Sequence, residues 1–481
     1  MPIPEGKIAP DPACHAVVVG AGVSGLLAAA TLSKRFHRVT VLERDPPVDP
    51  AEPRKGTPQA AHIHLLLIRG AEAVEGILPG VFDEIEASGG LKADSTRDLA
   101  FFHYGEWQPR GLADLPARLQ TRPFLEWHLA RRVSLLPNVT FLNQHEAHEL
   151  LCTESRVLGL HVQSLQSTNS FPLEADLVVD AAGRGSPIPR WLASRGFPAP
   201  RTSEVDLRIT YASRLYRAPA SAQAEDWRAM LVYPQAPDEF RGGALYFQEG
   251  NRWIVTMASY RGEAPPTDGQ SFIDFAKTLP SKEIHRLIID AEPVSEVATY
   301  RYRGAKRRHY EDLPTRPKGI VFVGDSVCSF NPVFGQGMTA AALQAEALGK
   351  HLDRYGLSDV EAPFSLAVAQ ICDTPWLLST TMDFRYPHAG GHRPVWLPVL
   401  DRYLKKFFSV TARDYGSLLD FMRVLHMISP PRVLARPRNL AVVVRHGLRR
   451  PPTPPSARPP LSAYSKSGEM RRRNRSEKAM F

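Results

Sequence analysis

The chain has little cysteine and no long apolar run. Its four cysteines (Cys14, Cys152, Cys328 and Cys372) are scattered over 481 residues and form no C-x-x-C pair. This spacing argues against a metal site and a disulfide framework, and it fits a reducing cytoplasm. No stretch of about 18 apolar residues occurs, so the sequence predicts no transmembrane helix. The N-terminal residues lack the pattern of a signal peptide, and we expect a cytoplasmic location.

Acidic residues are scarce in one segment. Residues 431–481 hold 13 Lys and Arg against 2 Asp and Glu, whereas the whole chain carries a net charge of +9. Six prolines between positions 451 and 460 are incompatible with helix or sheet. We expect a disordered, solvated basic tail without a nucleic-acid partner. A peripheral contact of this tail with an anionic membrane stays open.

A glycine-rich turn follows an apolar strand near the start of the chain. The β-branched run 17–19 is typical of a buried parallel strand. Gly20 then permits a tight turn, Gly22 lets the backbone approach a pyrophosphate, and Gly25 lets helix and strand pack closely. Glu43 ends the next predicted strand, at about the spacing of a ribose-binding carboxylate. The pattern predicts a Rossmann-type dinucleotide-binding unit.

Two further strand-to-turn segments carry an acidic residue and glycines. One contains Asp180 and Gly183, and the other places Asp325 after the apolar run 319–323. A carboxylate at this sheet edge can accept hydrogen bonds from a sugar-alcohol chain. The helix predicted to begin near Gly337 would direct its positive end at the negatively charged edge of a reduced flavin. An NAD dehydrogenase needs no such second loop to anchor its cofactor, so the segment that begins at Asp325 favours FAD over NAD.

The middle of the chain has a different texture. Residues 205–303 alternate apolar and polar side chains and are rich in aromatics, which predicts a sheet with one buried face. Tyr211, Tyr233, Phe247 and Trp253 could line a cavity there or simply pack in the core, and the sequence leaves both open.

These patterns predict an α/β fold: a Rossmann-type FAD-binding domain with an inserted β-sheet substrate domain and a C-terminal helical region. The expected divisions are 14–204 for the first part of the FAD-binding domain (with substrate-facing segments near 76–121), 205–303 for the substrate domain, 304–360 for the second part of the FAD-binding domain, 361–447 for the helical region and 448–481 for the tail.

The three motifs resemble those of the p-hydroxybenzoate-hydroxylase-like FAD-dependent monooxygenases, over residues 15–360. Three segments look more specifically like the bacterial polyether epoxidases of the monensin and lasalocid type. They are Arg-Lys-Gly-Thr-Pro-Gln-x-x-His-x-His at 54–64, Asp-Ala-Ala-Gly-Arg-Gly-Ser-Pro at 180–187 and Phe-Asn-Pro-Val-Phe-Gly-Gln-Gly-Met at 330–338.

The resemblance implies a set of FAD contacts. Glu43 would hold the adenosine ribose, Arg44 would lie near the adenine, Arg122 by the pyrophosphate and Asp325 at the ribityl chain. His62 and His64, in the loop expected over the flavin, are candidate catalytic residues, with a structural role left open. No metal site is expected. The full implied set is Gly20, Gly22, Gly25, Glu43, Arg44, Arg54, Arg122, Asp325, Pro332, Gly335, Gly337 and Met338.

The activity implied by the resemblance is monooxygenation. A C4a-hydroperoxyflavin, formed with O2, would transfer one oxygen atom to an apolar secondary metabolite such as a polyketide or terpenoid alkene, by epoxidation or hydroxylation. NAD(P)H would supply electrons directly or through a separate flavin reductase, because two alanines separate Asp180 from Gly183 where the hydroxylases have adjacent Asp and Gly. The alternatives are a reductase of the geranylgeranyl-reductase type, a halogenase, disfavoured because no W-x-W segment occurs, and, least favoured, a non-enzymatic flavin-binding protein.

Overall fold

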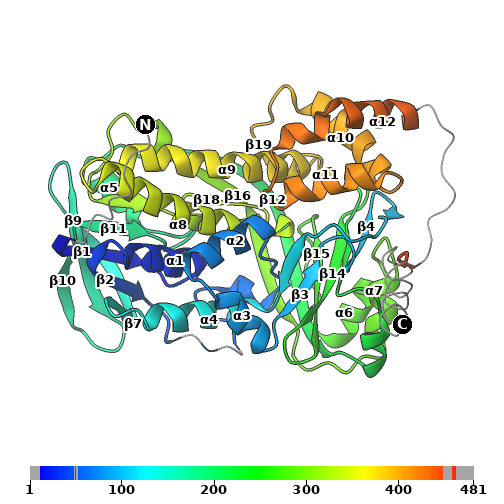
Figure 1. Cartoon of the computed structure of the whole chain (residues 1–481), viewed down its shortest axis with the longest axis horizontal. Coiled ribbons are helices and arrows are strands. Elements are labelled where there is room, and N and C mark those ends of the chain that lie inside the picture. The colour runs from blue at the N-terminus through cyan, green and yellow to red at the C-terminus, as the bar shows by residue number, and fades with distance from the viewer. Residues whose placement is uncertain (1–10, 48, 50–51, 448–457, 462–481) are drawn as a thin grey trace, which may run out of the picture.

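The computed structural model describes residues 11–47, 49, 52–447 and 458–461. A five-stranded parallel sheet, with the order β17-β11-β1-β2-β7, lies in the half of the molecule that contains the glycine-rich turn (Figure 1). Its strands are β1 (Asp11–Val19), β2 (Phe36–Glu43), β7 (Val139–Asn143), β11 (Leu177–Asp180) and β17 (Ile320–Phe322).

Helices cover this parallel sheet because its strands are apolar on both faces. Val17, Val18, Val178 and Val179 are completely buried. The packed helices are α1 (Val23–Leu32), α2 (Ile68–Ile77), α3 (Val81–Ala87), α4 (Arg122–Ser134), α5 (Ile188–Ser194), α8 (Gln336–Tyr355) and α9 (Glu361–Asp383). A three-stranded antiparallel sheet of β8 (His145–Cys152), β9 (Val157–Ser164) and β10 (Ser170–Glu174) flanks it.

The second large unit is a nine-stranded sheet with the order β18-β16-β12-β15-β14-β13-β4-β5, to which β19 adds beside β12. All its pairs are antiparallel except β4 with β13. The strands are β4 (Leu99–His103), β5 (Glu106–Trp107), β12 (Arg201–Arg217), β13 (Ala229–Val232), β14 (Arg241–Gln248), β15 (Arg252–Ser259), β16 (Ala298–His309), β18 (Cys328–Ser329) and β19 (Gly390–Gly391). The short helices α6 (Gly269–Ala276) and α7 (Glu283–Ile288) accompany it, and β3 (Leu91–Asp94) pairs separately with β6 (Pro116–Leu119).

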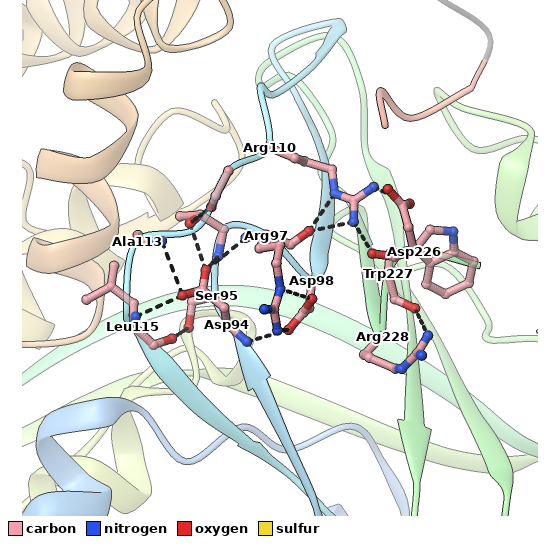
Figure 2. Close-up of polar contacts among 12 residues, drawn as sticks. Asp94, Ser95, Arg97, Asp98, Arg110, Ala113, Leu115, Asp226, Trp227 and Arg228 are labelled. Atoms are coloured by element: carbon pink, nitrogen blue, oxygen red, sulfur yellow. Dashed lines mark hydrogen bonds and ion pairs between the residues drawn. The ribbon is translucent and has the colours of Figure 1, made fainter. Parts of the chain in front are cut away.

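A buried polar network ties the loop before β4 to this sheet (Figure 2). Arg110 donates to the carbonyl of Arg97 at 2.8 Å and to the carboxylate of Asp226 at 2.6 Å. The Asp94 carboxylate accepts backbone N–H groups, including those of Arg97 at 2.9 Å and Leu115 at 3.0 Å. Because these groups are hydrogen-bonded to each other within the protein, removing one leaves its partner desolvated and without a hydrogen bond, which is unfavourable. The network holds β4 against β13, although 125 residues separate them.

The C-terminal helices α10 (Leu397–Thr411), α11 (Tyr415–Leu425) and α12 (Pro437–Gly447) form an outer lobe at the opposite end of the molecule from β9 and β10 (Figure 1). The α/β fold with a Rossmann-type domain, sheets and a C-terminal helical region is thus confirmed. None of the helices in the described residues has the length and apolarity needed to cross a bilayer.

Two details differ from the sequence pattern. The apolar residues Leu65 and Leu66 continue the pattern of the following helix, but α2 begins only at Ile68, because Leu66 pairs in a β-bridge with Arg118. The segment 173–179, whose pattern resembles one strand, is divided between β10 and β11, which belong to different sheets. Tertiary pairing decided both boundaries.

Candidate active site

A cavity of about 790 Å³ is lined by both large sheets. The parallel-sheet side contributes the glycine-rich turn, the end of β2 and the turn after β17. The nine-stranded sheet contributes mainly aromatic residues. Eleven of the twelve positions in the expected FAD set line this cavity: Gly20, Gly22, Glu43, Arg44, Arg54, Arg122, Asp325, Pro332, Gly335, Gly337 and Met338.

Gly25 does not line the cavity, because it packs beneath the turn. A Cβ atom at Gly25 would lie 1.8 Å from the carbonyl oxygen of Gly20, and Gly20 itself has a φ of +100°. In contrast, a Cβ at Gly22 would meet only the end of Arg54, 3.9 Å away. Helix α1 begins directly after Gly22 and has no side-chain cap. Its first N–H groups and positive dipole end are therefore available to an anion in the cavity.

A chain of buried charges runs along one wall. Arg54 donates from one nitrogen to Glu43 and from another to Glu126, each at 2.9 Å. Glu126 also accepts from Arg122 at 2.8 Å. Burial of Glu126 opposes its ionisation, but the charges of Arg122 and Arg54 outweigh burial and hold its pKa below the ordinary value. The Glu43 carboxylate, which was expected to face a ribose, additionally accepts the N–H of Ala21 at 2.7 Å.

The turn after β17 also lines the cavity, and it lies against the start of α1, because a Cβ atom at Gly324 would lie 2.6 Å from the Ser24 hydroxyl oxygen. Asp325 is open to the cavity but enclosed by protein, and this enclosure raises its pKa, against the opposing charges of Arg122 and Arg184. Beyond it, Gly335 adopts a left-handed conformation with a φ of +64°, and α8 begins at Gln336. A sharp turn thus directs the start of α8 at the cavity, as the sequence predicted for the helix near Gly337.

His62 and His64 both lie on the cavity wall. The Nδ1 atom of His62 is 2.7 Å from the hydroxyl of Ser213, which is 2.6 Å from that of Thr256. The Nε2 atom of His62 is buried without a hydrogen-bond partner in the described part of the chain. His64 lies 3.3 Å from Arg122 through its Nε2 atom. Burial lowers the pKa of His62 to about 4 and that of His64 to about 3, so both rings are neutral at pH 7.

Tyrosines dominate the other wall, and three of them hold the loop 329–335, which contains residues that the resemblance placed at the flavin. The hydroxyl of Tyr233 donates to the carbonyl of Val333 at 2.9 Å. Those of Tyr211 and Tyr302 donate at 3.5 Å to Asn331 and to the carbonyl of Ser329, respectively. The wall tyrosines are Tyr211, Tyr233, Tyr246, Tyr260, Tyr300 and Tyr302. Of the four aromatics singled out in the sequence, Tyr211 and Tyr233 line the cavity, whereas Phe247 and Trp253 pack in the core.

Asp180 lies under the site and does not line the cavity. Its carboxylate accepts from Ser186 at 2.7 Å and from the N–H of Ala182 at 3.1 Å, and it is completely buried. Burial raises its pKa to about 6, although these two hydrogen bonds act in the opposite direction. The middle motif therefore shapes a turn.

Two features of the site were missed by sequence reasoning. They are the contact of Ser213 and Thr256 with His62, and a buried contact of Asn331 with Asp383 at 2.6 Å. Ser, Thr and Asn carry no motif signal of their own, so only their placement identifies them.

The residues present fit FAD. An elongated dinucleotide needs a glycine cradle, free N–H groups at a helix start, a carboxylate at the second strand and a further acidic residue near the flavin end. The cavity offers all of these: Gly20 and Gly22, the start of α1, Glu43 and Asp325. FAD would supply the redox chemistry at the tyrosine-lined end.

Known proteins support this assignment. Residues 18–48 match the family described as an NAD(P)-binding Rossmann-like domain. The chain is 30% identical over 452 residues to Protein Rv3254 of Mycobacterium tuberculosis, covering 91% of this chain and 95% of that one. It is 23% identical over 358 residues to a squalene epoxidase of Schizosaccharomyces pombe, covering 72% and 70% of the two chains.

Solved structures share the fold. The flavin-dependent brominase Bmp2 superposes with a TM-score of 0.64 at 14% identity, covering 90% of this chain and 98% of that one. The p-nitrophenol 4-monooxygenase PnpA of Pseudomonas putida superposes with a TM-score of 0.61 at 19% identity, covering 85% and 98%. At these identities the likeness concerns the fold alone.

The Rossmann-type unit predicted from the first motif is confirmed by the family match, and the relatives and solved structures agree with the superfamily, the enzyme class and the use of FAD with NAD(P)H predicted from the three motifs. The chain belongs to the family of Protein Rv3254, and it shares its fold with FAD-dependent monooxygenases.

Proposed function

We propose that this protein transfers one oxygen atom from O2 to an apolar substrate, by alkene epoxidation or by hydroxylation. The observation that carries the proposal is one continuous cavity, with dinucleotide-binding features at one end and tyrosines and aliphatic residues at the other. A relative that is by name a squalene epoxidase supports an apolar alkene. The substrate class that best fits is a polyketide or terpenoid alkene of secondary metabolism.

Binding of the cofactor would rely on the glycine turn and the charged wall. The N–H groups at the start of α1 would meet the pyrophosphate, assisted by Arg122. Glu43 would accept from the adenosine ribose, near Arg44 and Arg54, and Asp325 would accept from the ribityl hydroxyls. Pro332, Gly335, Gly337 and Met338 would border the flavin ring.

When bound, reduced FAD would supply the electrons that activate dioxygen, which is the source of the transferred oxygen atom. The part of the protein itself is to exclude water, which prevents side reactions such as hydrolysis, and to orient the substrate. The buried tyrosines Tyr211, Tyr246 and Tyr260 provide a wall with little free polar surface. His62 would contribute a neutral ring to the cavity wall, with Ser213 fixing the orientation of the ring.

The test is purification followed by an absorbance spectrum and NADPH oxidation with and without an added flavin reductase. We expect bound flavin, and oxidation that an apolar alkene accelerates, with a product heavier by one oxygen atom. Stimulation by the added reductase would identify a separate reductase as the electron source. A product heavier by two hydrogen atoms would indicate a reductase instead, a halogenated product a halogenase, and failure to bind FAD would overturn the proposal.

A further inference from the structure

The start of helix α10 exposes a compact run of apolar side chains. Val395 is 95% exposed, Val399 is 75% exposed and Trp396 is 47% exposed. Burying such side chains is favourable, at roughly 1.5–3 kcal/mol for a large one, so leaving several together in water is costly. Grouped exposed apolar residues of this kind mark interaction sites. We call Val395, Trp396 and Val399 the α10 patch.

The α10 patch is continuous with the cavity wall. Leu397, in the same turn, is buried in a cluster with Tyr211, Tyr260 and Ala258. These three residues line the cavity from the other side. One apolar cluster therefore extends from the outer surface at the α10 patch to the end of the cavity that we assign to the substrate.

Basic residues outnumber acidic ones in the part of the chain that carries the α10 patch. The segment 393–447 holds 10 Lys and Arg against 3 Asp and Glu. Arg402 and Lys406 are exposed on the next turns of α10. The neighbouring helix α12 exposes Val444 (64%) beside Arg445. Figure 1 shows both helices in the outer lobe.

We propose that this lobe docks on the surface of an anionic lipid bilayer, with the α10 patch inserted at the headgroup level. Tryptophan next to aliphatic and basic side chains is the composition of an interfacial helix. The basic residues complement the negative surface potential of anionic lipids. Nucleic acid would satisfy the charges but would leave the valines in water. The surface would present the apolar cluster, and the cavity behind it, to molecules dissolved in the bilayer.

The binding test uses the full-length protein with sedimenting vesicles of phosphatidylcholine alone or mixed with phosphatidylglycerol. We expect binding to the mixed vesicles only. The double variant Val395→Ser/Val399→Ser should bind about tenfold or more weakly, and Arg402→Gln and Lys406→Gln about fivefold each. Leu135→Ser is the matched control, since Leu135 is 71% exposed in a different part of the molecule and should bind as the parent does.

A second readout places the patch in the bilayer. Trp396 is the only tryptophan among the exposed large apolar residues of the described chain. Brominated lipids should quench part of the tryptophan emission in the parent, and Trp396→Phe should abolish that quenching. Unchanged melting temperatures would verify that the variants are folded. The proposal is overturned if the double-serine variant binds as tightly as the parent, which would assign binding to the basic tail, or if no quenching depends on Trp396.

Discussion

Asn331, in the loop 329–335, donates a hydrogen bond of 2.6 Å to Asp383 at the end of helix α9. Both side chains are about 1% exposed. The second carboxylate oxygen of Asp383 has no hydrogen-bond partner among the described residues. Asn331 also accepts the N–H of Val333 at 3.1 Å, so the pair connects the loop at the cavity to the helix behind it.

The protonation of Asp383 should make stability depend on pH. Burial raises its pKa to about 7, although the hydrogen bond from Asn331 acts in the opposite direction. The folded state therefore binds more protons than the unfolded state between pH 4 and 7, and the free energy of unfolding falls as pH rises through that window. Asp383→Asn keeps an acceptor for Asn331 and removes the titration. Relative to the parent, the free energy of unfolding of the variant should rise by on the order of 3 kcal/mol between pH 4 and pH 8. Urea unfolding at both pH values measures this difference. Parallel pH curves for parent and variant would contradict the prediction.

The titration of His62 should lower the free energy of unfolding as pH falls, whereas that of Asp383 lowers it as pH rises. Because burial lowers its pKa to about 4, protonation disfavours the folded state, and the stability it contributes above pH 6.5 is lost as pH falls toward 4. His62→Gln keeps a polar group near Ser213 and removes this loss. The variant should have a smaller decrease in melting temperature between pH 7.5 and 4.5 than the parent, and an equal decrease would show that His62 is not the group responsible.

Removal of the Arg54 side chain should destabilise the fold and weaken FAD binding. Arg54→Met leaves Glu43 and Glu126 buried next to each other, and breaking a buried ion pair in this way costs about 3–5 kcal/mol. Arg35→Met is the control, because Arg35 pairs with Asp353 at the surface and such pairs contribute about 0–1 kcal/mol. Urea unfolding and a flavin titration measure both effects, and similar losses in the two variants would refute the structural role of Arg54.

The glycine turn should tolerate no side chain at Gly25. In Gly25→Ala the Cβ atom would overlap the carbonyl of Gly20 at 1.8 Å, so α1 must move away from the turn and flavin retention should be lost. Gly76→Ala, near the C-terminal end of α2, meets no atom within 4 Å and should be neutral or stabilise the fold by up to about 1 kcal/mol. The flavin absorbance of the purified variants gives the result.

The hydrogen bond from Tyr233 to Val333 should restrict the motion of the loop 329–335. Tyr233→Phe leaves the carbonyl of Val333 without this donor, at a cost of about 1 kcal/mol. If the proposed function is correct, the looser loop should admit water, and a larger share of NADPH oxidation should yield hydrogen peroxide in place of product. The control is Tyr246→Phe, since the Tyr246 hydroxyl has no hydrogen-bond partner in the described residues. Equal peroxide yields from both variants would argue against this role.

The sequence by itself determined the dinucleotide unit and its cofactor end. Strand residues 17–19, the turn at Gly20 and the acidic ends of two strands are local patterns, because a turn or a helix start needs particular residues at adjacent positions. The same locality allowed the fold class to be predicted, whereas the family resemblance of the three motifs implied the set of which eleven residues line the cavity.

Only the tertiary structure decided what surrounds the reactive end. Asn331 and Asp383 are 52 residues apart, and His62 and Ser213 are 151 apart. Their residue types are common and follow no period, so their contact depends on how α9 and the nine-stranded sheet pack onto the parallel sheet. The ion pair of Glu43 with Arg54 is of the same kind: the position of Glu43 is a strand-end pattern, but its partner comes from a loop that the fold brings across the turn.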